Sequence, residues 1–163
     1  KRRKTGNRQM SKEVIEQLKN IRNEIIFEFL DEQDFVTIAP FFELKNYPSG
    51  SIVFREGEPG EFIGFVLSGK LEVKKQTEFK GNQLIIAILG KGSMVGELSI
   101  FDKHKRSATV EAVEDTNLLI LKNDSINSLI EQFPYIGAKL LKGLIRILSL
   151  RLRKATERLT NIF

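Results

Sequence analysis

The residues between Gly96 and Val110, which read GELSIFDKHKRSATV, combine groups suited to a ligand that is both a sugar and a phosphate. Glu97 is followed nine residues later by Arg106. A carboxylate accepts hydrogen bonds from sugar hydroxyl groups, whereas a guanidinium binds two phosphate oxygens at once. A surface salt bridge beside a turn is the simpler interpretation, because exposed acids and bases are common. That interpretation does not explain the glycine before the acid or the small polar residue after the arginine.

The backbone around this pair also favours an anion. Gly96 allows the main chain to approach a ligand closely. A short helix that begins near Leu98 would direct backbone N–H groups towards a negative charge.

Four further segments place glycines between short apolar runs, as at the corners of a β-roll. They are residues 47–57 (YPSGSIVFREG), 59–61 (PGE), 65–73 (FVLSGKLEV) and 89–95 (LGKGSMV). Together with residues 96–110, here called the cassette, they make the chain from about Phe35 to Phe163 resemble the cyclic nucleotide-binding domains. That family includes catabolite activator proteins, regulatory subunits of protein kinases and nucleotide-gated channels. The resemblance implies an α+β fold, mainly β: a β-roll between an N-terminal helical segment and a long C-terminal helix.

The resemblance also implies roles for individual residues. Glu97 matches the acid that holds the ribose 2′-hydroxyl, and Arg106 matches the arginine that binds the cyclic phosphate. Ser107 stands where a hydroxyl bonds phosphate or a guanine amino group. The other expected ligand contacts come from backbone amides, an apolar wall and the last helix: Gly96, Leu98, Ser99, Val66, Leu71, Ala108, Val110 and Thr156. Ile52 and Leu67 belong to the same expected wall, although for any one of these residues a core position is the simpler interpretation.

Base selectivity is less clear from the sequence. In catabolite activators a Thr-Ser pair on the last helix contacts adenine, and here the matching residues are Ala155 and Thr156. One hydroxyl is therefore missing. We expect cAMP to be the ligand, with cGMP also bound.

Composition narrows the functional class. The chain has 163 residues, no cysteine and one histidine, so disulfides and cysteine nucleophiles are excluded and a metal site is not expected. No nucleophile or ligand set accompanies Asp102 and Glu97, so we expect no enzyme activity. No signal peptide or transmembrane run is visible, and the lack of cysteine fits a cytoplasmic protein.

Charge and periodicity divide the chain into four parts. Residues 1–10 lack apolar periodicity and predict a basic linker, and residues 11–43 predict helices, with Val14, Leu18, Ile21, Ile25 and Phe29 on one face. Residues 44–122 predict the β-roll, with a hairpin turn at Gly81-Asn82. Residues 123–163 predict two helices: a hinge helix capped by Asn123, and a lid helix that begins at Pro134. The net charge of +5 comes from the two ends. Basic ends suit nucleic acid or a membrane, but solvated helix faces explain them as well, and we expect no direct nucleic-acid binding here.

The last helix carries a heptad pattern. Its apolar residues alternate spacings of four and three: Leu141, Ile145, Leu148, Leu152, Ala155, Leu159 and Ile162. This pattern predicts a homodimer, the alternative being one amphipathic stripe on the parent domain. The whole chain is interpreted as a regulatory sensor module that passes a helix movement to a fused or partner output domain. Two alternatives are the sensor half of a truncated Crp-like transcription factor and a dimeric scaffold with a vestigial or repurposed pocket.

Overall fold

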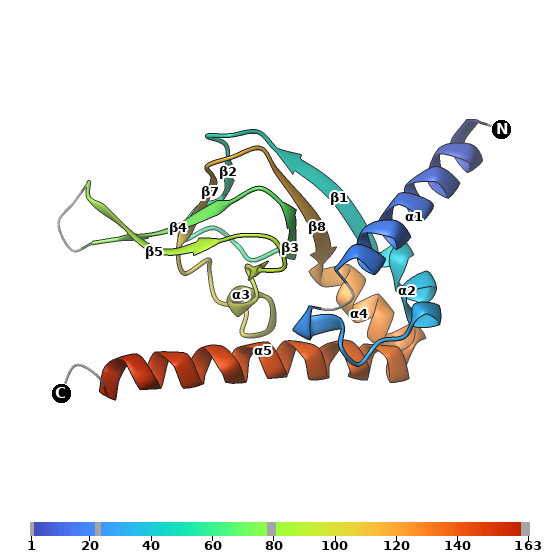
Figure 1. The fold of residues 1–163 in the computed structure, drawn as a ribbon. Coiled ribbons are helices and arrows are strands. Elements are labelled where there is room, and N and C mark those ends of the chain that lie inside the picture. Colours follow the sequence, from blue (N-terminus) through green and yellow to red (C-terminus); the bar gives the residue numbers. More distant parts are fainter. Residues whose placement is uncertain (1, 22–23, 78–80, 161–163) are drawn as a thin grey trace.

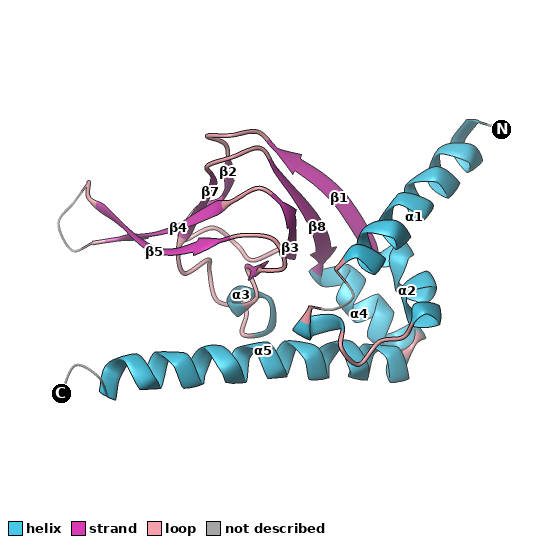
Figure 2. Cartoon of the chain, viewed as in Figure 1, coloured by secondary structure: helices cyan, strands magenta, loops and turns pink. Residues whose placement is uncertain are grey.

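A computed structural model describes residues 2–21, 24–77 and 81–160, and shows two antiparallel sheets with helices at one end and beneath them (Figures 1 and 2). The predicted β-roll with flanking helices is confirmed. The helices are α1 (Arg2–Asn20), η1 (Ile25–Phe27), α2 (Glu32–Ile38), η2 (Ala39–Phe41), α3 (Leu98–Phe101), α4 (Asn123–Gln132) and α5 (Pro134–Thr160). The strands are β1 (Phe42–Tyr47), β2 (Ile52–Phe54), β3 (Phe62–Ser68), β4 (Leu71–Gln76), β5 (Gln83–Leu89), β6 (Met94–Val95), β7 (Thr109–Ala112) and β8 (Thr116–Lys122).

The two sheets have the strand orders β1-β8-β3-β6 and β2-β7-β4-β5, and they enclose one of two hydrophobic cores. Strand β8 shows how the cores are divided. Leu118 and Ile120 lie in the core between the sheets, whereas Leu119 and Leu121 lie in the second core, which the helices cover. Because side chains alternate along a strand, β8 is buried on both faces and joins the roll to the helices.

The N-terminal segment differs from its prediction. The expected linker over residues 1–10 is wrong, because α1 begins at Arg2. The helix ends at Asn20, so Ile25 and Phe29 do not continue its apolar face and are 39% and 38% exposed. Instead the chain turns and buries Ile26 and Phe27 in η1. Helical spacing alone does not reveal this turn, because a tertiary contact with α5 creates it.

Two other boundaries shift by a residue or two. Asp31 caps α2 and forms a capping box with Asp34, and strand β1 already begins at Phe42, two residues before the predicted start of the β-roll. Asn123 is the first residue of α4 rather than its cap, a position taken by Lys122. The turn predicted at Gly81-Asn82 does connect β4 to β5, with Gly81 at φ +97°.

Helix α5 begins at Pro134, as predicted, and its two halves have different surroundings. Leu140 and Leu144 in the first half are buried in the helical core, and Lys139 donates to Asp34 at 2.7 Å. The second half runs on beneath α3 and the β4–β5 hairpin (Figure 1). None of the described helices is both long and apolar enough to cross a bilayer.

Gly143 permits a close approach between α5 and the N-terminal segment. A Cβ atom at this position would lie 2.0 Å from the carbonyl oxygen of Ile26. Although alanine stabilises most helix interiors relative to glycine by about 1 kcal/mol, the clash should reverse this preference. We expect Gly143→Ala to lower the free energy of unfolding by about 1–3 kcal/mol in urea titrations. Gly90→Ala is the control because its Cβ would meet no atom within 4 Å. Equal stability of the two variants would contradict this packing.

Candidate functional site

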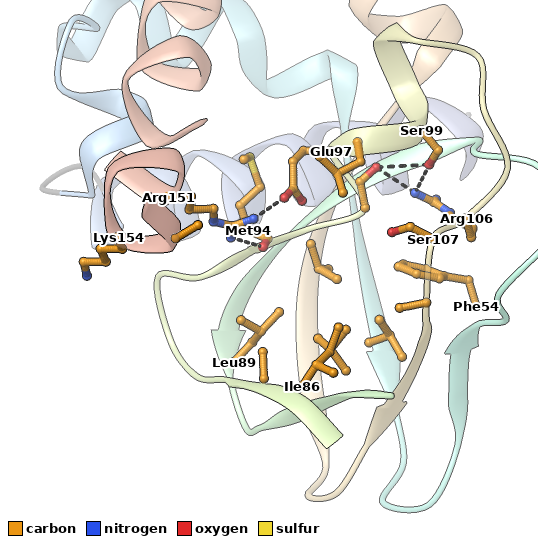
Figure 3. Close-up of a pocket in the computed structure, with 18 of the residues that line it drawn as sticks. Phe54, Ile86, Leu89, Met94, Glu97, Ser99, Arg106, Ser107, Arg151 and Lys154 are labelled. Atoms are coloured by element: carbon orange, nitrogen blue, oxygen red, sulfur yellow. Dashed lines mark hydrogen bonds and ion pairs between the residues drawn. The ribbon is translucent and has the colours of Figure 1, made fainter. Parts of the chain in front are cut away.

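A cavity of about 370 Å³ lies between the β-roll and the second half of α5 (Figure 3). Its walls come from strands of the roll such as β5, from the cassette and from α5, which lies much further along the sequence. The apolar lining residues are Phe54, Val73, Ile86, Ala87, Leu89, Met94, Val95, Leu98, Ala108, Val110 and Ala155. The polar lining residues are Glu97, Ser99, Arg106, Ser107, Arg151, Lys154 and Arg158. One end is therefore rich in charge and the rest is apolar, as in most small-molecule sites.

Arg106 lies at the charged end and is only 3% exposed. Its Nη1 donates to the Gly96 carbonyl oxygen at 2.7 Å and to Ser99 Oγ at 2.9 Å, while Nη2 donates to the Phe62 carbonyl oxygen at 2.8 Å. A guanidinium has five N–H donors, so three are used by neutral groups. The buried Nε has no partner among the described residues. Arg106 therefore presents a buried positive charge together with N–H donors that a ligand could use.

Burial affects the charge of Arg106. Removal from water lowers the pKa of its guanidinium, although the negative charge of Glu97 opposes this effect. No carboxylate among the described residues forms an ion pair with Arg106. A buried cation without a paired anion is unfavourable, and an anionic ligand would relieve that cost.

Glu97 is 7% exposed and is paired with an arginine from the other side of the cavity. Arg151 Nη1 donates to Glu97 Oε1, and Arg151 Nη2 donates to the Met94 carbonyl oxygen at 2.7 Å (Figure 3). These contacts tie α5 to the cassette. Because the ion pair uses Oε1, the second carboxylate oxygen can accept a hydrogen bond from a sugar hydroxyl.

Gly96 is required by this geometry. Its φ is +82°, and a Cβ would lie 2.4 Å from Arg106 Nη1 and 2.9 Å from the Phe62 carbonyl oxygen. Any side chain at this position would therefore strain the backbone and displace the guanidinium.

The structure brings most of the predicted site residues together. The eight that line the cavity are Gly96, Glu97, Leu98, Ser99, Arg106, Ser107, Ala108 and Val110. Val66 and Leu71 do not line it, because both are wholly buried between the sheets, where neighbouring side chains cover them completely. Ile52 and Leu67 are also absent from the lining.

Thr156 likewise lies outside the cavity of its own chain. Its side chain is exposed, and its hydroxyl donates to the Leu152 carbonyl oxygen at 3.0 Å. Neighbouring Ala155 lines the cavity instead, because adjacent helix residues point about 100° apart.

The role of Arg151 was not identified from the sequence. One signal was available: Arg151 lies seven residues after the buried Leu144, so both share the face of α5 that points to the roll. The apolar residues of β5, such as Ile86 and Leu89, were also missed as cavity lining.

Metal-binding arrangements were also sought. Within the part of the chain that the structure describes, no cluster of three or more His, Cys, Asp or Glu side chains could hold a metal ion.

Comparisons with known proteins agree with this geometry. The family model described as "Cyclic nucleotide-binding domain" matches residues 44–133. The "Cyclic AMP receptor protein" of Thermus thermophilus is 33% identical over 130 residues, which cover 80% of this chain and 58% of that protein. A "putative potassium channel protein" of Rhodopseudomonas palustris is 33% identical over 115 residues, covering 71% of this chain and 27% of that protein.

Solved structures show the same likeness. A crystal structure of a cyclic nucleotide-binding domain from Methylobacillus flagellatus has a TM-score of 0.82 and 27% identity, over 91% of this chain and 84% of that one. The chain spans less than two thirds of the two relatives named above. The matched residues include the roll, the cassette and α4, and the chain belongs to the cyclic nucleotide-binding domain family.

Proposed function

We propose that this domain is a sensor that binds a cyclic nucleotide, cAMP in preference to cGMP, in the cavity between the β-roll and α5. The observation that carries the proposal is the buried Arg106 with its unpartnered Nε. Nε and the remaining hydrogen of Nη2 are donors that a phosphate can accept from.

The charges that line the cavity support the same ligand class: among the described residues, Glu97 is the acid, and the cations are Arg106, Arg151, Lys154 and Arg158. At its charged end, Glu97 is compensated by Arg151, whereas Arg106 has no paired carboxylate among the described residues. A cyclic phosphodiester carries one negative charge and would balance Arg106. Its ribose would then lie near Glu97, and its base would reach the apolar wall that includes Ile86 and Leu89.

The preference for adenine over guanine is proposed from the relatives and from the lining of the cavity. A relative is named a cyclic AMP receptor protein, which favours cAMP. Thr156, the residue expected to read adenine, does not line the cavity of its own chain. With few neutral polar groups near the apolar wall, we expect the affinities for cAMP and cGMP to differ by about tenfold, the worth of one neutral hydrogen bond.

Signal output would pass through α5. Arg151 connects this helix to Glu97, so ribose recognition and the position of α5 share one carboxylate. A ligand that binds more tightly to one position of α5 shifts the population towards it. The movement of α5 would reach an output domain that is fused to this domain or belongs to a partner.

Glu97→Gln tests the ribose contact. We expect this variant to bind cAMP about tenfold more weakly, or weaker still, because a hydrogen bond to a charged acceptor contributes about 1.5–3 kcal/mol. A 2′-deoxy analogue lacks the hydroxyl, so its affinity should change less. Competition against a fluorescent cyclic nucleotide would measure both. Glu131→Gln is the control, since Glu131 is exposed on α4 and does not line the cavity. Equal weakening of cAMP and its 2′-deoxy analogue would refute this role of Glu97.

A further inference from the structure

The rings of Phe54 and Phe62 pack against the Arg106 guanidinium. The Cζ atom of Arg106 lies 4.0 Å from the centroid of Phe54 and 4.9 Å from that of Phe62. The two rings are 6.0 Å apart and inclined at 70°, so they form a corner rather than a parallel stack. Both distances are well within the range of a cation–π interaction.

The two rings stand in different relations to the cavity. Phe54 lines it, but Phe62 does not. Phe62 also accepts the Nη2 hydrogen bond through its carbonyl oxygen, so this one residue holds the guanidinium by its ring and by its backbone. Any effect of the Phe62 side chain on a ligand must therefore pass through Arg106 or through the general packing.

The chemistry of this corner differs from that of a salt bridge. A carboxylate paired with Arg106 would fix the guanidinium but would also neutralise it and compete with a phosphate. Aromatic faces and the oxygens of Gly96, Ser99 and Phe62 stabilise the cation without cancelling its charge. They leave the charge and the Nε donor to an incoming anion.

We infer that Phe54 and Phe62 are positioning residues that hold Arg106 in its phosphate-binding orientation before the ligand arrives. The inference rests on the proposed function in one respect: the expected consequence of this orientation is tight binding of a cyclic phosphate. The orientation of the guanidinium itself is a property of the free protein. It can therefore be tested with and without nucleotide.

The first measurement is the affinity of Phe62→Leu for cAMP by calorimetry. We expect about tenfold weaker binding, because without the cation–π contact the guanidinium is held less firmly in the orientation that binds phosphate. Phe41→Leu is the matched control: Phe41 is also half-buried and packs edge-on against Phe133, away from Arg106. Phe62→Met, whose flexible unbranched side chain can fill the space left by the ring, replaces Phe62→Leu if that variant does not fold. Equal affinities of the Phe62 and Phe41 variants would overturn the inference.

A double-mutant cycle separates positioning from packing. Lysine keeps the charge at position 106 but lacks the planar guanidinium that stacks on a ring. In an Arg106→Lys background, Phe62→Leu should therefore change the affinity for cAMP by less than about twofold. A loss as large as in the wild-type background would assign Phe62 to packing alone.

The second measurement needs no nucleotide. The Nε–H resonance of Arg106, assigned by its loss in Arg106→Lys, should be sharp in the free protein and shifted by the ring currents. The shift should decrease in Phe62→Leu and remain in Phe41→Leu. A signal like that of an exposed arginine would overturn the inference. If the wild-type protein bound no cyclic nucleotide, the proposed function would fail, and this resonance would still decide whether the rings hold Arg106.

Discussion

Replacing Arg106 by alanine is expected to abolish measurable binding of cAMP and cGMP. The substitution removes the cation and the unpartnered Nε donor from the charged end of the cavity. Truncating one partner of a buried, hydrogen-bonded charge pair costs about 2–5 kcal/mol or more, so the dissociation constant should rise by a factor of about 30 to several thousand. Calorimetry with each nucleotide measures the loss.

Two controls make this result specific. The fold should survive Arg106→Ala with a reduced melting temperature, since the carbonyl groups of Gly96 and Phe62 lose their donor. Circular dichroism would show this. Arg153→Ala removes an exposed arginine of α5 that does not line the cavity, so it should leave the affinity unchanged. Near wild-type affinity in Arg106→Ala would refute the assignment of the cassette.

Changing Leu148 and Leu152 together to lysine is expected to convert a homodimer into a monomer. Ile145, Leu152 and Leu159 are 62%, 69% and 63% exposed and recur every seven residues on α5. Two such stripes bury one another in a coiled coil, and charged side chains in the seam oppose this association. Leu141, by contrast, packs on the helical core of its own chain, and Ile162 lies outside the described residues.

Light scattering would measure the mass of both proteins. Leu150→Lys is the control for an added charge on this helix, because Leu150 is exposed on α5 but lies outside the heptad seam. It should leave the dimer intact. A wild-type protein that remains monomeric at high concentration would show that the heptad pattern does not mediate dimerisation.

The β-roll was predictable because its signals are local. Glycines punctuate short apolar runs, and the cassette presents Glu97, Arg106 and their neighbours within 15 consecutive residues. The N-terminal region was less predictable. Residues 2–10 form the start of α1 without an apolar face to reveal it, and the burial of Ile26 depends on its contact with Gly143, over 100 residues away.

The partners of the cassette residues were the least visible part of the site. Arg151 reaches Glu97 from 54 residues further along the chain, and Phe62 lies 44 residues before Arg106. Periodicity predicts which residues are apolar or share a face, but not which distant side chains meet. For the same reason Val66 and Leu71 were assigned to the ligand wall although they lie in the core between the sheets.

Calorimetric titration of the unmodified protein with cAMP, with adenosine in parallel, tests the central claim most directly. A buried Arg106 whose Nε donor has no partner in the described part of the chain predicts saturable binding of one cAMP per chain, much tighter than that of adenosine, which lacks the phosphate. A tenfold higher salt concentration should lower the affinity for cAMP only modestly, because the expected charge pair between the phosphate and Arg106 is buried. No saturable heat with cAMP or cGMP, or adenosine binding as tight as cAMP, would contradict the account.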